Sequence, residues 1–399
     1  MERFPIKQGV PGFKFAGIPA GIKDDSVKDL GLIFAEHPCS AAAVFTKNSV
    51  KAAPVLVCAE KTKNNSIQAV LVNSGNANAC TGQQGIKDTH KTSDTLALEL
   101  DLKSTLIAPF STGVIGVKFP TQRIIKRLPE LIKNLSAQNS KDFAESILTT
   151  DTCIKTSAFK DTINGEPVKV LGIAKGSGMI MPNMATMLAF IVTDISIEKK
   201  SLKSLLKEIN EETFNMISVD GDMSTNDSVI VLSSNMSKTP ITNKCSKTYD
   251  TFKKMLHQVM MELAEMIVKD GEGATKLIKI TVKNAKTDSD AKKAAMQVAN
   301  SCLVKTAFFG EDFNWGRIMG ALGSSGASFD MNRVALFFNK IAAVQNGQGI
   351  EKNILRLKKT VKKSEIDLLI DLKNGEKSCG VSTCDLSYEY VRINADYTT

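Results

Sequence analysis

One long uncharged segment constrains this chain more than any other feature of its sequence. Residues 176–193 contain no Asp, Glu, Lys or Arg. Such a run approaches the length of a membrane span, but it holds Pro182, Asn183 and two glycines, which a spanning helix tolerates poorly. We therefore predict buried irregular chain that leads into a fully apolar strand over 187–193.

The overall composition is that of an ordinary globular protein. The chain has 399 residues, of which 43% are hydrophobic, so two or three domains are expected. Its formal net charge is +9, but the lysines are mixed with acidic residues, and one Trp and four Tyr offer little stacking surface for nucleic acid. Eight cysteines without a CxxC motif, and no signal peptide, predict a cytoplasmic protein with reduced thiols that binds neither nucleic acid nor membrane.

Short β-like runs alternate with amphipathic helices along the whole chain. Strands are expected at 41–46, 54–58, 68–72, 105–109, 168–173, 187–193, 228–232, 277–282, 334–338, 366–372 and 388–393. Helices are expected at 85–100, 121–135, 141–148, 201–214, 249–268 and 288–302. Several strands follow one another directly, which favours an α+β layered fold over a doubly wound parallel sheet.

Most standard catalytic motifs are missing from the sequence. Three histidines lie in unrelated contexts, and neither a P-loop nor a GxGxxG follows a strand, so we predict no metal and no organic cofactor. The junction of Ala185 and Thr186 offers another chemistry. Attack of the Thr186 hydroxyl on the preceding carbonyl, followed by hydrolysis, would leave Thr186 as a new N-terminus whose α-amine serves as its base. From the residues alone, an ordinary buried loop remains the alternative.

The segment 175–188 resembles the cleavage segment of the ornithine acetyltransferase (glutamate N-acetyltransferase) family. Seven further motifs extend the resemblance, in the order of the family, from near residue 9 to the end of the chain. They lie at 73–82, 111–116, 149–152, 219–227, 270–276, 314–318 and 390–399.

The resemblance implies a layered α/β/β/α-type sandwich with a smaller α/β C-terminal domain, self-cleaved into two chains between Ala185 and Thr186. Residues 1–185 would form the α chain and the N-terminal part of the catalytic sandwich. Residues 186–285 would begin the β chain and complete the sandwich, and residues 286–399 would close the substrate site. The two pieces are expected to assemble as an α2β2 heterotetramer.

The resemblance also implies a transfer of acetyl from N2-acetyl-L-ornithine to L-glutamate in arginine biosynthesis, by a ping-pong mechanism through an acetyl-threonine. Thr186 would be the nucleophile, and Thr112 and Gly113 the oxyanion hole. The implied substrate-binding residues are Thr149, Lys175, Thr186, Glu272, Asn394 and Thr399, with Thr152 as an alternative to Thr149. The resemblance leaves open whether acetyl-CoA is a second co-substrate.

Two other functions fit parts of the pattern. A self-cleaving aminopeptidase would use the same type of nucleophile but would release free amino acids from peptides. A basic binding protein without enzymatic activity would keep the uncharged segment as plain core, and its chain would stay intact on a denaturing gel.

Overall fold

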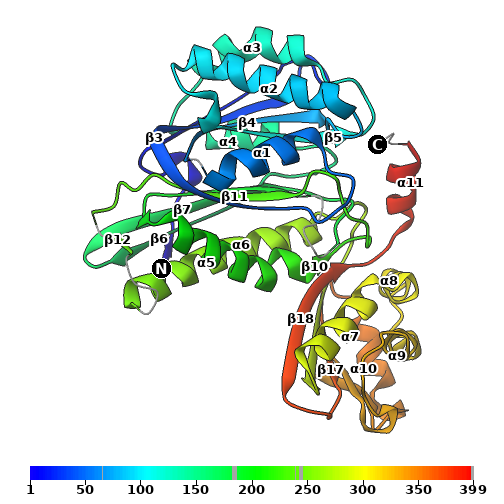
Figure 1. The fold of residues 1–399 in the computed structure, drawn as a ribbon. Helices are drawn as coiled ribbons and strands as arrows, with labels where there is room; N and C mark the ends of the chain where they lie inside the picture. Colours follow the sequence, from blue (N-terminus) through cyan, green and yellow to red (C-terminus); the bar gives the residue numbers. More distant parts are fainter. Residues whose placement is uncertain (65, 182–186, 239, 242–245, 397–399) are drawn as a thin grey trace.

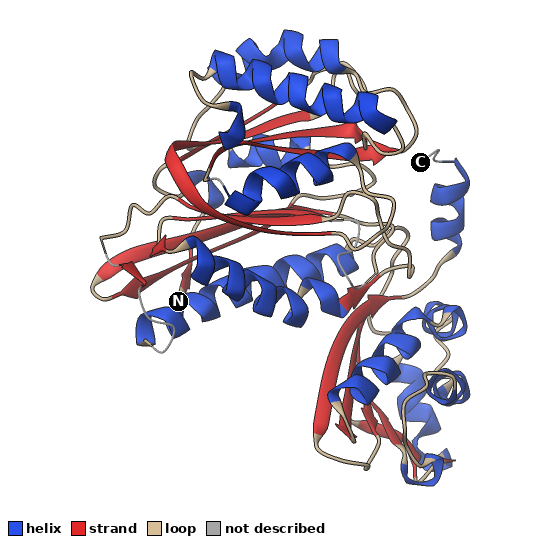
Figure 2. Cartoon of the chain, viewed as in Figure 1, coloured by secondary structure: helices blue, strands red, loops and turns tan. Residues whose placement is uncertain are grey.

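The computed structural model describes residues 1–399 apart from 65, 182–186, 239, 242–245 and 397–399. Two parts, each built around its own β-sheet, make up the structure (Figures 1 and 2). The larger part contains a nine-stranded sheet. Its path runs through β1 (Glu2–Arg3), β6 (Lys155–Ile163), β7 (Glu166–Lys175), β8 (Leu188–Thr193), β11 (Ser228–Ser233), β3 (Leu30–Phe45), β4 (Ile67–Asn76) and β5 (Ile107–Val114), with β2 (Phe13–Ile18) beside β3.

The long strand β3 divides this sheet into two facing layers. Its first half pairs with β2 and β4, its second half pairs with β11, and a register shift separates Phe34 from Cys39. The layers meet in a core where the rings of Phe110 on β5 and Phe190 on β8 lie edge to face, with centroids 5.2 Å apart. Phe143 from α4 (Ser140–Ser146) packs against Phe190 in the same way.

Helices cover the outer face of each layer (Figure 1). On one side lie α2 (Gly82–Glu99) and α3 (Thr121–Lys133), and α3 buries Ile124, Leu128 and Leu131 as its helical spacing predicts. On the other side lie α5 (Lys199–Glu212) and α6 (Lys247–Lys269). The predicted α/β/β/α sandwich is thereby confirmed. Within the described part of the chain, no helix has the length and apolar character needed to cross a bilayer.

The smaller part has a seven-stranded sheet with helices packed against it. Its strands, in spatial order, are β10 (Ile217–Ser218), β18 (Lys377–Cys384), β13 (Leu277–Ala285), β17 (Glu365–Asp371), β14 (Ala335–Phe338), β15 (Ile341–Gln345) and β16 (Gln348–Gly349). Its helices are α7 (Asp288–Asn300), α8 (Cys302–Phe309), α9 (Trp315–Gly323) and α10 (Ile354–Thr360). A separate pair of short strands is formed by β9 (Ser196–Ile197) and β12 (Pro240–Ile241). The seven-stranded sheet takes β10 and β13 from the range 186–285, and the domain bounds expected from the sequence stay a prediction.

Two expected strands are helices in the structure. The range 54–58 lies in α1 (Ala53–Asn64), where Val57 and Cys58 are buried with Lys61 and Thr62 one turn later, so the apolar run is one face of a helix packed against β5. The range 388–393 lies in α11 (Tyr388–Asp396). There the Ser387 hydroxyl accepts the first backbone N–H groups, as a helix N-cap does. The other expected elements overlap with observed elements of the same type.

The contact of Phe190 with two aromatic rings predicts a large contribution to stability. Replacing it in Phe190→Ala empties a fully buried site between the layers, and we expect a loss of about 3–5 kcal/mol in the free energy of unfolding, measured in denaturant. Leu98→Ala, on the exposed side of α2, is the control and should change stability by less than about 0.5 kcal/mol. An equal effect of the two substitutions would contradict this packing.

Candidate active site

A buried lysine brings two of the predicted site residues together. Lys175 ends β7, and its side chain is only 3% exposed. Its Nζ donates to Thr149 Oγ1 at 2.6 Å and to Thr112 Oγ1 at 3.4 Å. Because the ammonium group donates to the Thr112 oxygen, the hydroxyl hydrogen of Thr112 stays available for a third partner.

Gly113 follows Thr112 in a backbone conformation that requires glycine. Its φ angle is 129°, and a Cβ added there would lie 2.3 Å from the carbonyl carbon of Gly75 on the adjacent strand. A hydroxyl and a neighbouring backbone N–H are the kind of donors that stabilise an oxyanion. The arrangement therefore suits the predicted oxyanion hole, which stays a prediction.

A buried ion-pair network lies beneath these residues. The side chain of Asp151 is fully buried. Its carboxylate contacts Lys155 at 2.7 Å and Lys175 at 3.6 Å, and it accepts the backbone N–H of Gly176 at 2.6 Å. Lys155 also pairs with Asp270, which follows α6. Burial by itself would raise the pKa of Asp151, but the charges of Lys175 and Lys155 outweigh it and hold this pKa well below its usual range.

The second group of predicted residues lies at Glu272. The Glu272 carboxylate accepts a hydrogen bond from Asn394 Nδ2 at 2.8 Å, which connects the loop after α6 to α11. The Glu272 backbone N–H donates to the carbonyl of Ser177 at 2.9 Å. A Cβ at Gly178 would come within 2.4 Å of the Glu272 carboxylate. Glycine is therefore needed at position 178, where this carboxylate packs against the uncharged segment.

The start of the uncharged segment thus connects the two groups. The Ser177 hydroxyl lies 2.6 Å from that of Thr150, in the same turn as Thr149. Met179 and Ile180, which follow shortly after Ser177, donate their backbone N–H groups to the Asp220 carboxylate at 2.6 and 2.9 Å. The motif at 219–227 therefore fixes the backbone at the start of the uncharged segment.

Three predicted residues, Ala185, Thr186 and Thr399, lie outside the described residues. The next described residue after the junction is Met187, whose backbone N–H donates to Asp227 Oδ1 at 3.0 Å. Asp227 is fully buried, and its Oδ2 has no hydrogen-bond partner within the described ranges. Burial raises the pKa of Asp227 well above its usual value, which favours the neutral acid.

Sequence reasoning missed the supporting carboxylates. Asp151 stands inside the Thr-Thr-Asp-Thr motif, but nothing in that motif indicates that it pairs with two lysines. Asp270 precedes the Gly-Glu-Gly turn and accepts both the backbone N–H and the hydroxyl of Thr152. The contact with Lys175 therefore favours Thr149 over Thr152 as the threonine nearest the predicted oxyanion hole.

Comparison with known proteins shows the family of the chain. The family model described as the ArgJ family matches residues 14–399. The chain belongs to the ArgJ family. The arginine biosynthesis bifunctional protein ArgJ of Geobacter sulfurreducens is 46% identical over 391 residues, which cover 98% of this chain and 100% of that protein. The protein of the same name from Caldanaerobacter subterraneus is 45% identical over 392 residues, with 97% of each chain covered.

A solved ArgJ structure also matches part of the chain. The crystal structure of the arginine biosynthesis bifunctional protein ArgJ from Bacillus halodurans has a TM-score of 0.51 and 36% sequence identity. It covers 52% of this chain and 98% of the solved chain. The family and the enzyme class expected from the sequence, an acyltransferase of arginine biosynthesis, are thereby confirmed.

The charge of Asp151 is expected to be necessary for stability. Asp151→Asn leaves Lys155 and Lys175 without their shared buried partner, and we expect a loss of about 3–5 kcal/mol in unfolding free energy at pH 7. In the wild type the native pKa of Asp151 is depressed. Its contribution is therefore complete above the unfolded pKa of about 3.9 and is lost as the pH falls below it.

Denaturant titrations at several pH values test this expectation. The stability difference between wild type and Asp151→Asn should shrink below about pH 4. The control is Asp142→Asn, because Asp142 is 37% exposed and its partner Lys28 keeps Glu145. It should cost less than about 1 kcal/mol. A pH-independent difference for Asp151→Asn would show that lost packing, and not charge, causes the effect.

Proposed function

We propose that this chain is a glutamate N-acetyltransferase that moves the acetyl group of N2-acetyl-L-ornithine to L-glutamate in arginine biosynthesis. The observation that carries the proposal is the convergence of Thr112, Thr149 and Lys175 with Glu272 and Asn394 on one short segment of the chain. That segment leads directly to the Ala-Thr junction. Membership of the ArgJ family supports the same reaction.

The proposal includes self-cleavage between Ala185 and Thr186. The pieces 1–185 and 186–399 would stay together without a covalent link, because β8 lies between β7 of the first piece and β11 of the second. The solved relative from Bacillus halodurans supports two chains, since that chain matches only 52% of this one over nearly its whole length. The proposed assembly is an α2β2 heterotetramer.

The reaction would proceed in two acyl transfers at Thr186. Its Oγ attacks the acetyl carbonyl and passes its proton to the α-amine of the same residue. Thr112 and Gly113 donate to the oxyanion; the C–N bond then breaks, and ornithine leaves with the proton from the α-amine. The amine of glutamate next attacks the acetyl-threonine ester. The ester C–O bond breaks, Thr186 Oγ regains a proton by way of its α-amine, and N-acetylglutamate is released.

Charged side chains would select the substrates. Both amino-acid substrates carry an α-carboxylate, and ornithine carries an additional side-chain ammonium group. Lys175 is the proposed partner of a carboxylate, and Glu272, which is 9% exposed, is the proposed partner of the ammonium group. Asn394 fixes one oxygen of Glu272 and leaves the other available.

Acetyl-CoA is the proposed second acetyl donor, and no resident cofactor is required. The curated relatives are named bifunctional proteins, which supports a second activity besides the exchange reaction. A thioester would acylate Thr186 in the same way as the amide, with release of the CoA thiol. The enzyme would then also act as an N-acetylglutamate synthase.

Processing tests the nucleophile directly. Thr186→Ala should remain one full-length chain, because the alanine side chain has no hydroxyl group that could attack the preceding carbonyl. The wild type should give two fragments, measured by intact mass. Thr162→Ala, at an exposed position on β6, is the control and should process normally. Cleavage that persists in Thr186→Ala would contradict the proposal.

Acetylornithine–glutamate exchange without release of amino acids from peptides would separate this enzyme from an aminopeptidase.

Glu272→Gln should separate recognition of the ammonium group from the chemistry. We expect kcat/KM for acetylornithine to fall about 10²-fold, because the substrate ammonium loses its ionic partner. N-acetyl-L-norvaline, which lacks that ammonium group, should be affected much less. Glu265→Gln, which alters a partly exposed pair with Lys279, is the control. An equal loss with both donors would show that Glu272 does not bind the ammonium group.

A further inference from the structure

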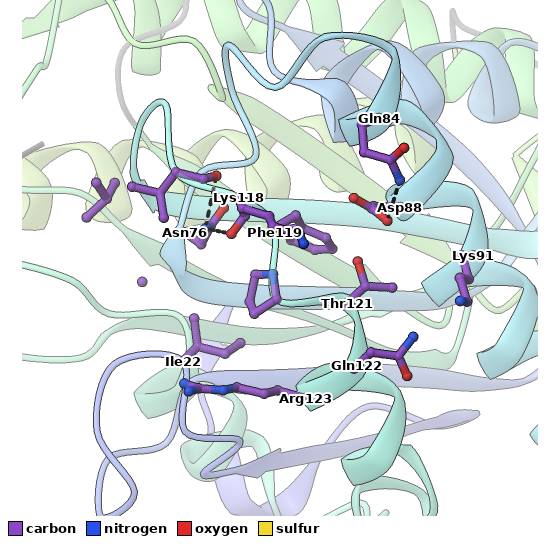
Figure 3. A pocket seen from close by; sticks show the side chains of 14 residues that line it. Ile22, Asn76, Gln84, Asp88, Lys91, Lys118, Phe119, Thr121, Gln122 and Arg123 are labelled. Carbon is purple, nitrogen blue, oxygen red and sulfur yellow. Dashed lines mark hydrogen bonds between the residues drawn. The ribbon is translucent and has the colours of Figure 1, made fainter.

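A separate cavity lies next to the predicted oxyanion hole. It has a volume of about 960 Å³ and lies where α2 and α3 approach the ends of β4 and β5 (Figure 3). This volume is at the upper end of the range of small-molecule sites. Neither the oxyanion-hole residues nor Glu272 is among the residues that line it, so it is distinct from the proposed amino-acid site.

One end of this cavity adjoins β5, the strand that carries Thr112 and Gly113 and is called the oxyanion strand below. Gly75 lines the cavity and pairs in register with Gly113, and Val114, the residue after Gly113, also lines it. With glycine at both paired positions, only backbone separates this end of the cavity from Gly113. Ile22 and Val117 make the same region of the lining apolar. An uncharged, flexible arm is the kind of group that fits this end.

The remaining wall of the cavity is basic. Lys91, Lys118 and Arg123 line it, and each is exposed. The ammonium groups of Lys91 and Lys118 have no hydrogen bond or ion pair within the described part of the chain. A neighbouring hollow of about 640 Å³ shares Arg123 and adds the lysines and arginine at 23, 126 and 127. Three aspartates line the two hollows and Arg127 pairs with Glu130, so these six basic groups outnumber the acidic groups by two. Clustered lysines with an arginine fork suit the oxygens of phosphate groups.

A buried hydroxyl at this wall also lacks a partner. Thr121, the first residue of α3, is 7% exposed, and its Oγ1 makes no hydrogen bond to any described residue. Figure 3 shows Thr121 between Asp88 and Gln122, with the ring of Phe119 beside them. A hydroxyl, a carboxylate and an aromatic ring together suit a base that carries an amino group, such as adenine.

We propose that this cavity binds coenzyme A, with its phosphates on the basic wall and its acyl arm directed along Gly75 and Val114 toward the oxyanion strand. This inference rests on the proposed acetyl-CoA activity and gives it a site separate from that of the amino acids. A polyanionic thioester and a small amino acid amide would then reach one nucleophile from different sides.

Charge reversal at the exposed rim tests the site without disturbing the core. The test variant is Lys118→Glu with Arg123→Glu. The control is Lys87→Glu with Lys133→Glu, which changes the net charge equally at exposed positions of α2 and α3 that do not line the cavity. Calorimetry with CoA should show binding to the wild type and the control. Binding to the test variant should be at least about 10-fold weaker.

Steady-state assays give a second readout. The test variant should have an acetyl-CoA KM raised at least about 10-fold, with acetylornithine–glutamate exchange within about 2-fold of the wild type. Absence of CoA binding, equal binding by the test variant, or equally tight binding of ATP would overturn the proposal. Wild-type exchange measured in parallel tests the proposed function separately, because it needs no CoA. Loss of exchange in the wild type would overturn that function and leave the calorimetric test of the cavity intact.

Discussion

The buried carboxylate of Asp151 is the interaction on which the rest of the site depends. It joins the turn after α4 to β6 through Lys155 and to the end of β7 through Lys175, and it fixes the backbone at Gly176. Burial of two ammonium groups would be costly without this anion. Because Lys175 in turn holds the hydroxyls of Thr149 and Thr112, the position of the predicted oxyanion donor follows from the ion-pair network.

Strand pairing explains how a chain cut in this segment keeps its site. On β8, Leu188 pairs with Lys175 of β7 on one side and with Ser228 of β11 on the other. Asp227, which immediately precedes β11, holds the N–H of Met187. Asp227 of the second piece therefore holds Met187, and strands of both pieces pair with Leu188, and none of these contacts requires the peptide bond between residues 185 and 186. The buried strand β8, which begins two residues after the junction, would thus anchor the new chain start.

Local patterns allowed much of the fold to be predicted, but long-range pairing was not visible in them. The apolar stripe of α3 has a clear helical period and β8 is an unbroken apolar run, and both elements are observed. The short apolar runs at 54–58 and 388–393 fit a strand as well as a helix, and their tertiary setting decides between the two. Asp151 and Asp227 act on residues 24 and 40 positions away in sequence, so no spacing rule identifies them.

The distribution of charge is where the sequence was least informative. Along the chain the lysines alternate with acidic residues, which is typical of a solvated surface, and the densest basic run lies at 358–363, in and just after α10. In the structure, Lys91 from α2 and Arg123 from α3 meet at one cavity with Lys118 from the loop between β5 and α3. The amino-acid site holds Lys175 and Glu272, one charge of each sign and both almost entirely buried, whereas this cavity presents to solvent lysines that have no ion pair with any described residue. Buried charges of both signs suit small zwitterions, and exposed cations suit a larger polyanion, so the two regions favour different acetyl donors.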